Sequence, residues 1–284
     1  MSDHNELVSI IIPCHNHGQF LGEAIESALH QTHQPIEVFV VDDGSTDDSA
    51  QVASRYPITV LTQPRAGVCA AVNRGMRVAR GEFAMRLDAD DVLEPTFVEE
   101  TLTPLQHHAD IHFVYTSVAY FGAKAGSYAV EEFDAESLAE RNYVHASALM
   151  RRVSFERVGG YDSSMARARC EDWDLWLAFA ERGLAGAFVP KPLLRYRQHP
   201  VSSRNTLKWT SWQVLQRNLL MATRLQVNHP RLFAPGLLLR RLSRLPARVR
   251  HGGASPRFAL LLTLLYGFML IRSLSQFTGV RAFA

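Results

Sequence analysis

Short apolar segments alternate with amphipathic segments through the first third of the chain, and this alternation restricts the possible folds more than any other feature. Each apolar segment has the length of a buried strand, and each amphipathic segment repeats with the period of a helix. Strands that alternate with helices favour a mostly parallel sheet covered on both faces. The expected strands are 8–13, 36–41, 58–63 and 83–88, and the clearest helices are 19–32 and 67–81.

The rest of the chain divides into an irregular middle and a helical tail. We expect further strands in the middle, some of them antiparallel, and one helix that ends at a glycine; these segments are 112–121, 146–150, 186–190, 193–199 and 171–183. The tail has a helical pattern interrupted by prolines. The prediction is an α/β protein with a Rossmann-like, mostly parallel central sheet in residues 1–205 and a basic helical extension in residues 206–284.

The formal net charge of +2 conceals an uneven distribution. Residues 201–284 contain 13 lysines and arginines and no acidic residue, whereas residues 1–200 carry a net charge of −11. Such asymmetry predicts two parts with different partners. The three scattered cysteines suggest neither a disulfide framework nor a zinc site, and the polar first residues lack an export pattern. We therefore expect a cytoplasmic protein.

Acidic residues follow two of the expected strands directly. Asp88, Asp90 and Asp91 come after the apolar strand 83–88, and Asp42 and Asp43 follow strand 36–41. In open α/β sheets, ligands bind beyond the carboxyl ends of the strands. An Asp-x-Asp turn can chelate a hard divalent cation that bridges to a diphosphate. The alternative is an acidic turn that caps a helix, as Ser45 with Asp48 also suggests after the second strand.

These motifs together resemble glycosyltransferase family 2, whose catalytic domain has the GT-A fold. The similarity covers roughly residues 7–205, through VSIIIPCHNHGQFLGEAIESALHQT, IEVFVVDDGSTDDS, AGVCAAVNRGMRVARGEF, MRLDADDVLEP, VGGYD, CEDWDLWLAFAERG and YRQHPVSSR in that order. The resemblance implies a nucleotide-sugar donor, a divalent metal (Mn²⁺ or Mg²⁺) and inversion at the anomeric carbon.

The resemblance also implies a donor site. Pro13, His15 and Asp43 would hold the nucleobase, Asp88 would face the ribose, and Asp90 would bind the metal. The same candidate site includes Asn16, Asp42 and Asn73, and the late His199 is a candidate ligand of the metal or the diphosphate. The chain departs from the family pattern in two places. His15 stands where many members have a stacking tyrosine, and Val72 where many have a basic residue.

The EDWDLW segment, residues 171–176, contains the residues that are expected to act on the acceptor. Inverting transfer needs a general base to take the proton of the attacking hydroxyl. By resemblance Asp172 is that base, and Glu171 orients it or the acceptor. Acids in the first turn of a helix also simply complement its dipole. Trp173 and Trp176 could stack on a sugar, although only one of them is expected to be exposed and the other to pack in the core.

The basic tail suggests a surface partner. Its segment 258–271 has 14 uncharged residues, too few for a membrane span. Leucines alternating with arginines favour peripheral contact of residues 231–284 with an anionic membrane. The alternatives are a helical hairpin that packs on the catalytic domain or forms a homodimer. Nucleic-acid binding is not expected.

The predicted function is metal-dependent transfer of one sugar from a nucleoside-diphosphate sugar, most often expected to be a UDP-sugar. The expected acceptor is a hydroxyl of a lipid-linked or cell-envelope glycan. We expect the reaction to take place at the inner face of the cell membrane. A processive synthase is disfavoured because the Q-x-x-R-W motif is absent. The alternatives are a sugar-phosphate nucleotidyltransferase and an inactive scaffold that binds nucleotide sugars.

Overall fold

The computed structural model describes residues 6–128, 130–199, 212–239, 267 and 269–271. The chain divides into two compact units, residues 1–206 and residues 207–284. All the residues predicted to carry the chemistry belong to the first unit.

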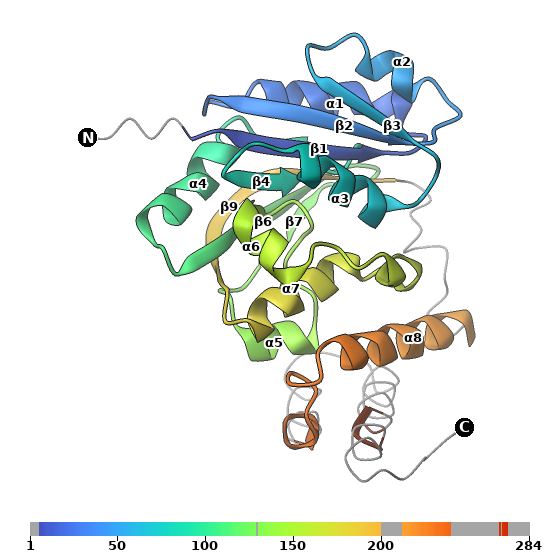
Figure 1. The fold of residues 1–284 in the computed structure, drawn as a ribbon, viewed down its shortest axis with the longest axis vertical. Helices are drawn as coiled ribbons and strands as arrows, with labels where there is room; N and C mark the ends of the chain where they lie inside the picture. The colour runs from blue at the N-terminus through green and yellow to red at the C-terminus, as the bar shows by residue number, and fades with distance from the viewer. Residues whose placement is uncertain (1–5, 129, 200–211, 240–266, 268, 272–284) are drawn as a thin grey trace. The chain divides into compact units, whose positions relative to one another are not determined.

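The described part of the first unit is built around a nine-stranded sheet (Figure 1). Four parallel strands form one half in the order β3-β2-β1-β4; they are β1 (Val8–Cys14), β2 (Ile36–Asp43), β3 (Thr59–Gln63) and β4 (Phe83–Arg86). The sheet continues through β8 (Leu149–Arg151), β6 (Ile111–Gly122), β9 (Ala185–Gln198) and β5 (Val92–Leu93), with β7 (Gly126–Tyr128) paired to β6. The predicted α/β class with a mostly parallel sheet is confirmed.

Helices cover both faces of the parallel half. Because successive side chains of a strand point to opposite faces, Ile10 and Ile12 of β1 share an apolar core with α1 (Gly18–Leu29), while Ile11 faces α3 (Val68–Val78). Gly75 lets α3 approach closely, since a Cβ there would lie 2.5 Å from Cγ2 of Ile11. The remaining helices of this unit are α2 (Ser49–Ala53), α4 (Phe97–His107), α5 (Ala135–Glu140), α6 (Arg152–Val158) and α7 (Glu171–Glu181), with a 3₁₀ turn at Ser163–Ala168.

Two local predictions need correction. The segments 186–190 and 193–199 were expected as separate strands, but they form one strand, β9. Its register against β6 shifts between Val189 and Pro192, because proline has no N–H to donate. The helix expected to start at Ser45 begins at Ser49. The Ser45 hydroxyl is used elsewhere, accepting the backbone N–H of Asn16 at 3.1 Å.

The second unit contains α8 (Trp212–Asn228). Nε2 of Gln226 donates to the carbonyl of Met269 at 2.7 Å, so distant parts of this unit pack together. No helix in the described part of the chain is long and apolar enough to cross a membrane. Most of the segment 231–284, to which membrane contact was assigned, lies outside the described residues.

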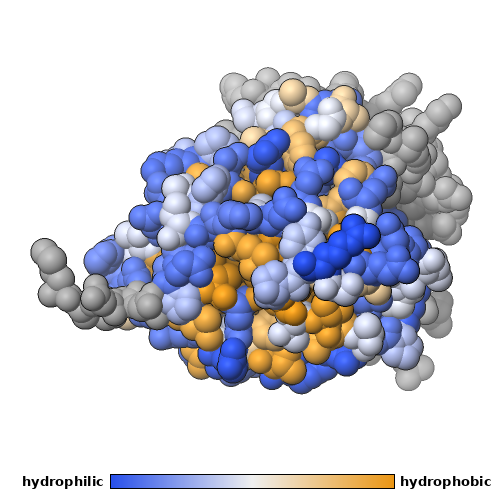
Figure 2. All heavy atoms as spheres, turned by 90° about the horizontal axis from the view of Figure 1, so that it is seen from above, coloured by the Kyte–Doolittle hydropathy of each residue, from blue (hydrophilic) through white to orange (hydrophobic). Residues whose placement is uncertain are grey.

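Figure 2 shows one face of the molecule, on which hydrophobic side chains gather near the centre among hydrophilic ones.

Candidate active site

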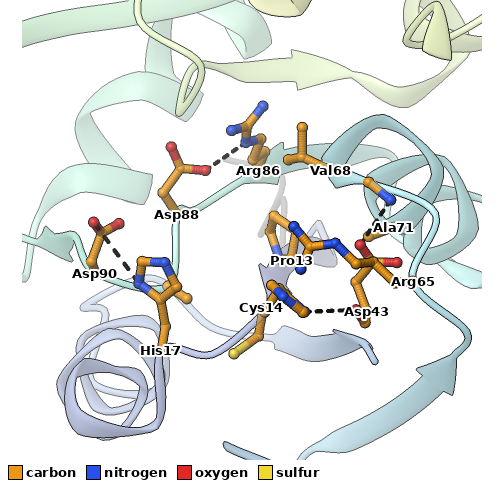
Figure 3. Close-up of a pocket in the computed structure, with 13 residues that line it drawn as sticks. Pro13, Cys14, His17, Asp43, Arg65, Val68, Ala71, Arg86, Asp88 and Asp90 are labelled. Carbon is orange, nitrogen blue, oxygen red and sulfur yellow. Dashed lines mark hydrogen bonds and ion pairs between the residues drawn. The ribbon is translucent and has the colours of Figure 1, made fainter. Parts of the chain in front are cut away.

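A cavity of about 400 Å³ lies beyond the carboxyl ends of β1, β2 and β4. Five of the predicted donor-site and metal-site residues line it: Pro13, His15, Asp43, Asp88 and Asp90. In Figure 3, Asp88 and Asp90 lie on one side, and Asp43 and Arg65 lie on the other. The carboxyl ends of the parallel strands therefore bring together side chains that are up to 77 positions apart in the sequence, as expected for an open α/β sheet.

Asp43 organises the loop on one wall of this cavity. Its Oδ1 accepts from Nε2 of Gln63 and from the backbone N–H of Ala66, each at 2.7 Å, and its Oδ2 accepts from the N–H of Gly67 at 2.8 Å. These bonds hold the chain just before α3. Among the described residues Oδ2 accepts from one donor, and a carboxylate oxygen can accept two hydrogen bonds, so Asp43 can still bind a ligand N–H.

The loop after β1 is fixed by the loop after β2. Nδ1 of His15 donates to the carbonyl of Asp43 at 2.9 Å, which orients the imidazole ring at the cavity. Oδ1 of Asn16 accepts from the N–H of Thr46 at 2.7 Å, and the positive φ of 57° at Asn16 is tolerated by this residue type. Asn16 therefore shapes the loop, and stacking of His15 on a base stays a prediction.

The aspartates of the acidic cluster, Asp88, Asp90 and Asp91, make different contacts. Oδ1 of Asp88 accepts from Nε of Arg86 at 2.6 Å. Asp91 turns away from the cavity, is buried, and accepts the N–H of Arg197 at 2.9 Å. Burial raises the pKa of Asp91 well above its usual range, and the charges of Asp88 and Asp90 raise it further. A cation is therefore expected between two of the three acids at most.

Asp90 has two histidines near it. Nε2 of His199 lies 2.8 Å from Oδ2 of Asp90, and Nδ1 of His17 lies 4.0 Å from the same oxygen. In the described part of the chain, no group of three or more histidine, cysteine or acidic side chains already has the geometry to hold a metal ion. The donor set itself, one carboxylate and an imidazole in contact, suits a divalent ion. The predicted pair Asp90 and His199 thus fits the metal that the family resemblance implies.

Arg86 connects the acidic cluster to the predicted catalytic helix. Besides Asp88, its guanidinium contacts Oε1 of Glu171 through Nη1 at 3.3 Å, and the side chain is only 8% exposed. Burial alone would lower the pKa of Arg86, but the charge of Asp88 outweighs it, with further contributions from Tyr161 and Glu171, so this pKa is raised. One buried cation therefore spans both halves of the site.

Asp172 lies in the first turn of α7, directly after Glu171. Burial, and then the charge of Glu171, raise the pKa of Asp172 to about 6, against the opposing effect of Arg86. Its Oδ2 accepts from Nδ2 of Asn142 at 3.0 Å, and its Oδ1 accepts from the N–H of Trp173 at 2.8 Å. A carboxylate with a pKa near neutrality is suited to take a proton.

Tyr161 and His145 lie within electrostatic range of Asp88, and each buries a polar atom. Oη of Tyr161 and Nδ1 of His145 have no hydrogen-bond partner among the described residues. Burial lowers the pKa of His145 to about 4 and raises that of Tyr161 above its usual range. The charge of Asp88 raises the pKa of both groups, which opposes the effect of burial on His145 and adds to it on Tyr161.

The cavity lining also lacks Asp42, Asn73, Trp173 and Trp176. Asp42 accepts the N–H of Ser45 at 2.9 Å and stabilises the turn after β2. The side-chain amide of Asn73 is used by both backbone groups of Tyr161, at 2.8 and 3.0 Å. Trp176 is fully buried and stacks on Phe113 at 4.7 Å, so its assignment to sugar stacking is corrected to a core role. Trp173 is half-buried and its Nε1 donates to the carbonyl of Leu138, so stacking by Trp173 stays a prediction.

Sequence reasoning missed Arg65, Arg86 and His17, each of which lines the cavity. Arg86 could have been noticed, because it is a charged residue in an otherwise apolar strand, FAMR. His17 lies two positions after His15, in a segment already assigned to the site. No signal in the sequence distinguishes Arg65 from other loop arginines.

Residues 9–171, more than half of the chain, match the sequence pattern of a protein family described as Glycosyl transferase family 2. The chain belongs to glycosyltransferase family 2. Among curated relatives, the chain is 30% identical over 186 residues to chondroitin synthase of Escherichia coli, covering 62% of this chain and 27% of that protein. It is also 30% identical over 218 residues to an uncharacterized glycosyltransferase of Rickettsia prowazekii, covering 72% of this chain and 67% of the relative.

Solved structures share the fold at low sequence identity. TarS of S. aureus in complex with UDP-GlcNAc superposes with a TM-score of 0.63 at 16% identity, over 77% of this chain and 66% of that one. Glucosyl-3-phosphoglycerate synthase of Mycobacterium tuberculosis, in complex with Mn²⁺, UDP and its product, gives 0.55 at 18% identity, over 79% of this chain and 80% of that one. This glycosyltransferase therefore has a GT-A catalytic fold.

Proposed function

We propose that this family 2 enzyme transfers a single sugar from a UDP-sugar to a hydroxyl group, with inversion and with the help of a divalent metal. The observation that carries the proposal is that Arg86 pairs both with Asp88 of the cavity and with Glu171, the residue next to Asp172. In this proposal Asp172, whose pKa is raised to about 6, serves the acceptor side of the cavity that Asp88 and Asp90 line. Inverting transfer needs a base opposite the departing diphosphate.

The donor cavity supports a nucleoside diphosphate. His15 and Pro13 offer a ring and an apolar surface to a base, and Asp43 has room to accept a ring N–H. Arg65 adds a positive charge on the same wall as Asp43 (Figure 3). Solved structures that share this fold contain UDP, UDP-GlcNAc or GDP-mannose, and two contain Mn²⁺. Asp90 and His199 would hold the metal, which when bound stabilises the negative charge that develops on the diphosphate.

On the acceptor side, Asp172 takes the proton of the attacking hydroxyl. Asn142 holds its carboxylate by a direct hydrogen bond, and the charge of the neighbouring Glu171 helps to raise its pKa. Oη of Tyr161 is buried and has no hydrogen-bond partner among the described residues, and a sugar hydroxyl that reached it would supply one. Trp173 would present part of its ring to the acceptor.

The acceptor we propose is a lipid-linked or cell-envelope glycan, reached at the inner face of the cell membrane. The basic composition of residues 231–284 and the relation to a chondroitin synthase support this choice. A homodimer through the same tail is the alternative. The chain spans about a quarter of that synthase, so the relation supports the class of acceptor and not its identity.

The base assignment is tested with Asp172→Asn, assayed by release of UDP from a panel of UDP-sugars with Mn²⁺. We expect turnover to fall about 10²- to 10⁴-fold, because the variant keeps the shape of the base and cannot accept a proton. Affinity for UDP, measured by calorimetry, should stay within about twofold of the wild type. Glu181→Gln, a carboxylate change at the far end of the same helix, is the matched control.

Two outcomes would contradict the proposal. Normal turnover by Asp172→Asn would remove the base from this position. Binding of UDP without turnover of any nucleotide sugar by the wild type would instead favour an inactive scaffold.

A further inference from the structure

His17 lies at the acidic cluster without a role in the fold. Its backbone is anchored, because its N–H donates to Oγ of Ser49 and its carbonyl accepts from the first residues of α1. Its side chain is 38% exposed, makes no helix-capping hydrogen bond, and points toward Asp90 (Figure 3). No side-chain hydrogen bond ties the ring to the start of α1.

The ring nitrogen of His17 that faces Asp90, Nδ1, has an unusual environment. Nδ1 of His17 is shielded from solvent and has no hydrogen-bond partner among the described residues. Most buried polar atoms in proteins are paired, so an unpaired imidazole nitrogen needs an explanation. A neutral imidazole offers such a nitrogen as a lone pair to a metal ion.

The distances around Asp90 suit a third ligand. Two ligand atoms about 2.1 Å from one octahedral ion and adjacent to each other lie about 3.0 Å apart. Asp90 and His199 are already at 2.8 Å, and His17 needs to move by about 1 Å from its 4.0 Å separation. Phe20 has its ring 5.1 Å from that of His199 and 6.4 Å from that of His17, so it packs beside both imidazoles.

We propose that His17 is a third protein ligand of the divalent ion, completing a set of two imidazoles and one carboxylate with Asp90 and His199. The inference rests on the metal dependence in the proposed function and deepens it. Imidazole nitrogens favour transition metals, whereas Mg²⁺ prefers oxygen ligands. The set therefore selects Mn²⁺ or another transition metal over Mg²⁺, with its open positions left for diphosphate oxygens.

The test measures metal binding on the full chain and does not depend on turnover. Mn²⁺ alone, and Mn²⁺ with UDP, are titrated by electron paramagnetic resonance into the wild type, His17→Ala and His17→Gln. Pulsed measurements on the same samples report coordinated imidazole nitrogens. His107→Ala is the matched control. His107 is exposed at the end of α4, just before β6 begins, and it does not line the cavity.

We expect the wild type to show two coordinated imidazoles, and both His17 variants to show one with Mn²⁺ affinity about tenfold lower. The preference for Mn²⁺ over Mg²⁺, from competition titrations, should fall by a similar factor. His107→Ala should match the wild type. Unchanged affinity and nitrogen coupling in the His17 variants would overturn this inference and leave the proposed function standing, whereas a wild type that binds no Mn²⁺ would overturn both.

Discussion

The donor side of the first unit, residues 8–91, and the acceptor side, residues 111–198, satisfy their polar groups in different ways. On the donor side, Asp43 has three protein donors, and Asn16 bonds back to the loop after β2. On the acceptor side, Tyr161 and His145 each bury a polar atom for which the described residues provide no partner, and the pKa of Asp172 is raised to about 6.

The difference teaches that the two sides are prepared for different tasks. Backbone donors fix the carboxylate of Asp43 before any ligand arrives, and such preorganisation favours binding. Buried unpaired groups cost free energy, and hydrogen bonds to the hydroxyl groups of a bound sugar would recover part of that cost. Strained or unsatisfied groups concentrate where function requires them. We therefore expect the donor side to tolerate few changes in shape and the acceptor side to respond mainly in catalysis.

The largest effect is expected from breaking the link between the two sides. Arg86→Met removes the buried cation that contacts both Asp88 and Glu171. Loss of one partner from a buried ion pair leaves uncompensated charge and costs about 3–5 kcal/mol. We expect the free energy of unfolding, from urea denaturation, to fall by that amount.

Arg80→Met is the control for the loss of an arginine paired with a carboxylate. The Arg80 side chain pairs with Glu37 but is 78% exposed, and exposed pairs contribute about 0–1 kcal/mol. If Arg86→Met costs no more than Arg80→Met, Arg86 does not couple the two sides.

A smaller effect is expected from acidification. Because Asp172 must be unprotonated to accept a proton, and its pKa is about 6, kcat/KM should decline by roughly tenfold for each pH unit below that value. The pH profile of UDP release checks this. The residual activity of Asp172→Asn should lack this acid limb, and a limb that persists in the variant would assign it to another group.

Much of the donor side was predictable, because strand ends determine where Pro13, Asp43 and Asp88 emerge. Alternating apolar segments locate the strands, and parallel pairing brings their ends to one edge. The sequence could not show which way each side chain turns after the strand. Asp91 faces the core and Asp42 caps a turn because of bonds to Arg197 and Ser45 that depend on loop geometry.

The acceptor side was less predictable, because its contacts join residues that are distant in the chain. Arg86 and Glu171 are 85 positions apart, and Asn73 and Tyr161 are 88. Helical periodicity placed Trp173 and Trp176 on one helix, but only packing against Phe113 shows that Trp176 belongs to the core. The family resemblance suggested a binding role for Asn73, whose side-chain amide instead bonds the backbone of Tyr161.

The central claim is that Asp90 holds a divalent ion that in turn holds a nucleoside diphosphate. The most direct test is calorimetric titration of UDP, with GDP in parallel, into the wild type with Mn²⁺, into the wild type with EDTA, and into Asp90→Asn with Mn²⁺. The account predicts binding in the first case and an affinity at least about tenfold lower in the other two. Equal affinity in all three would contradict it.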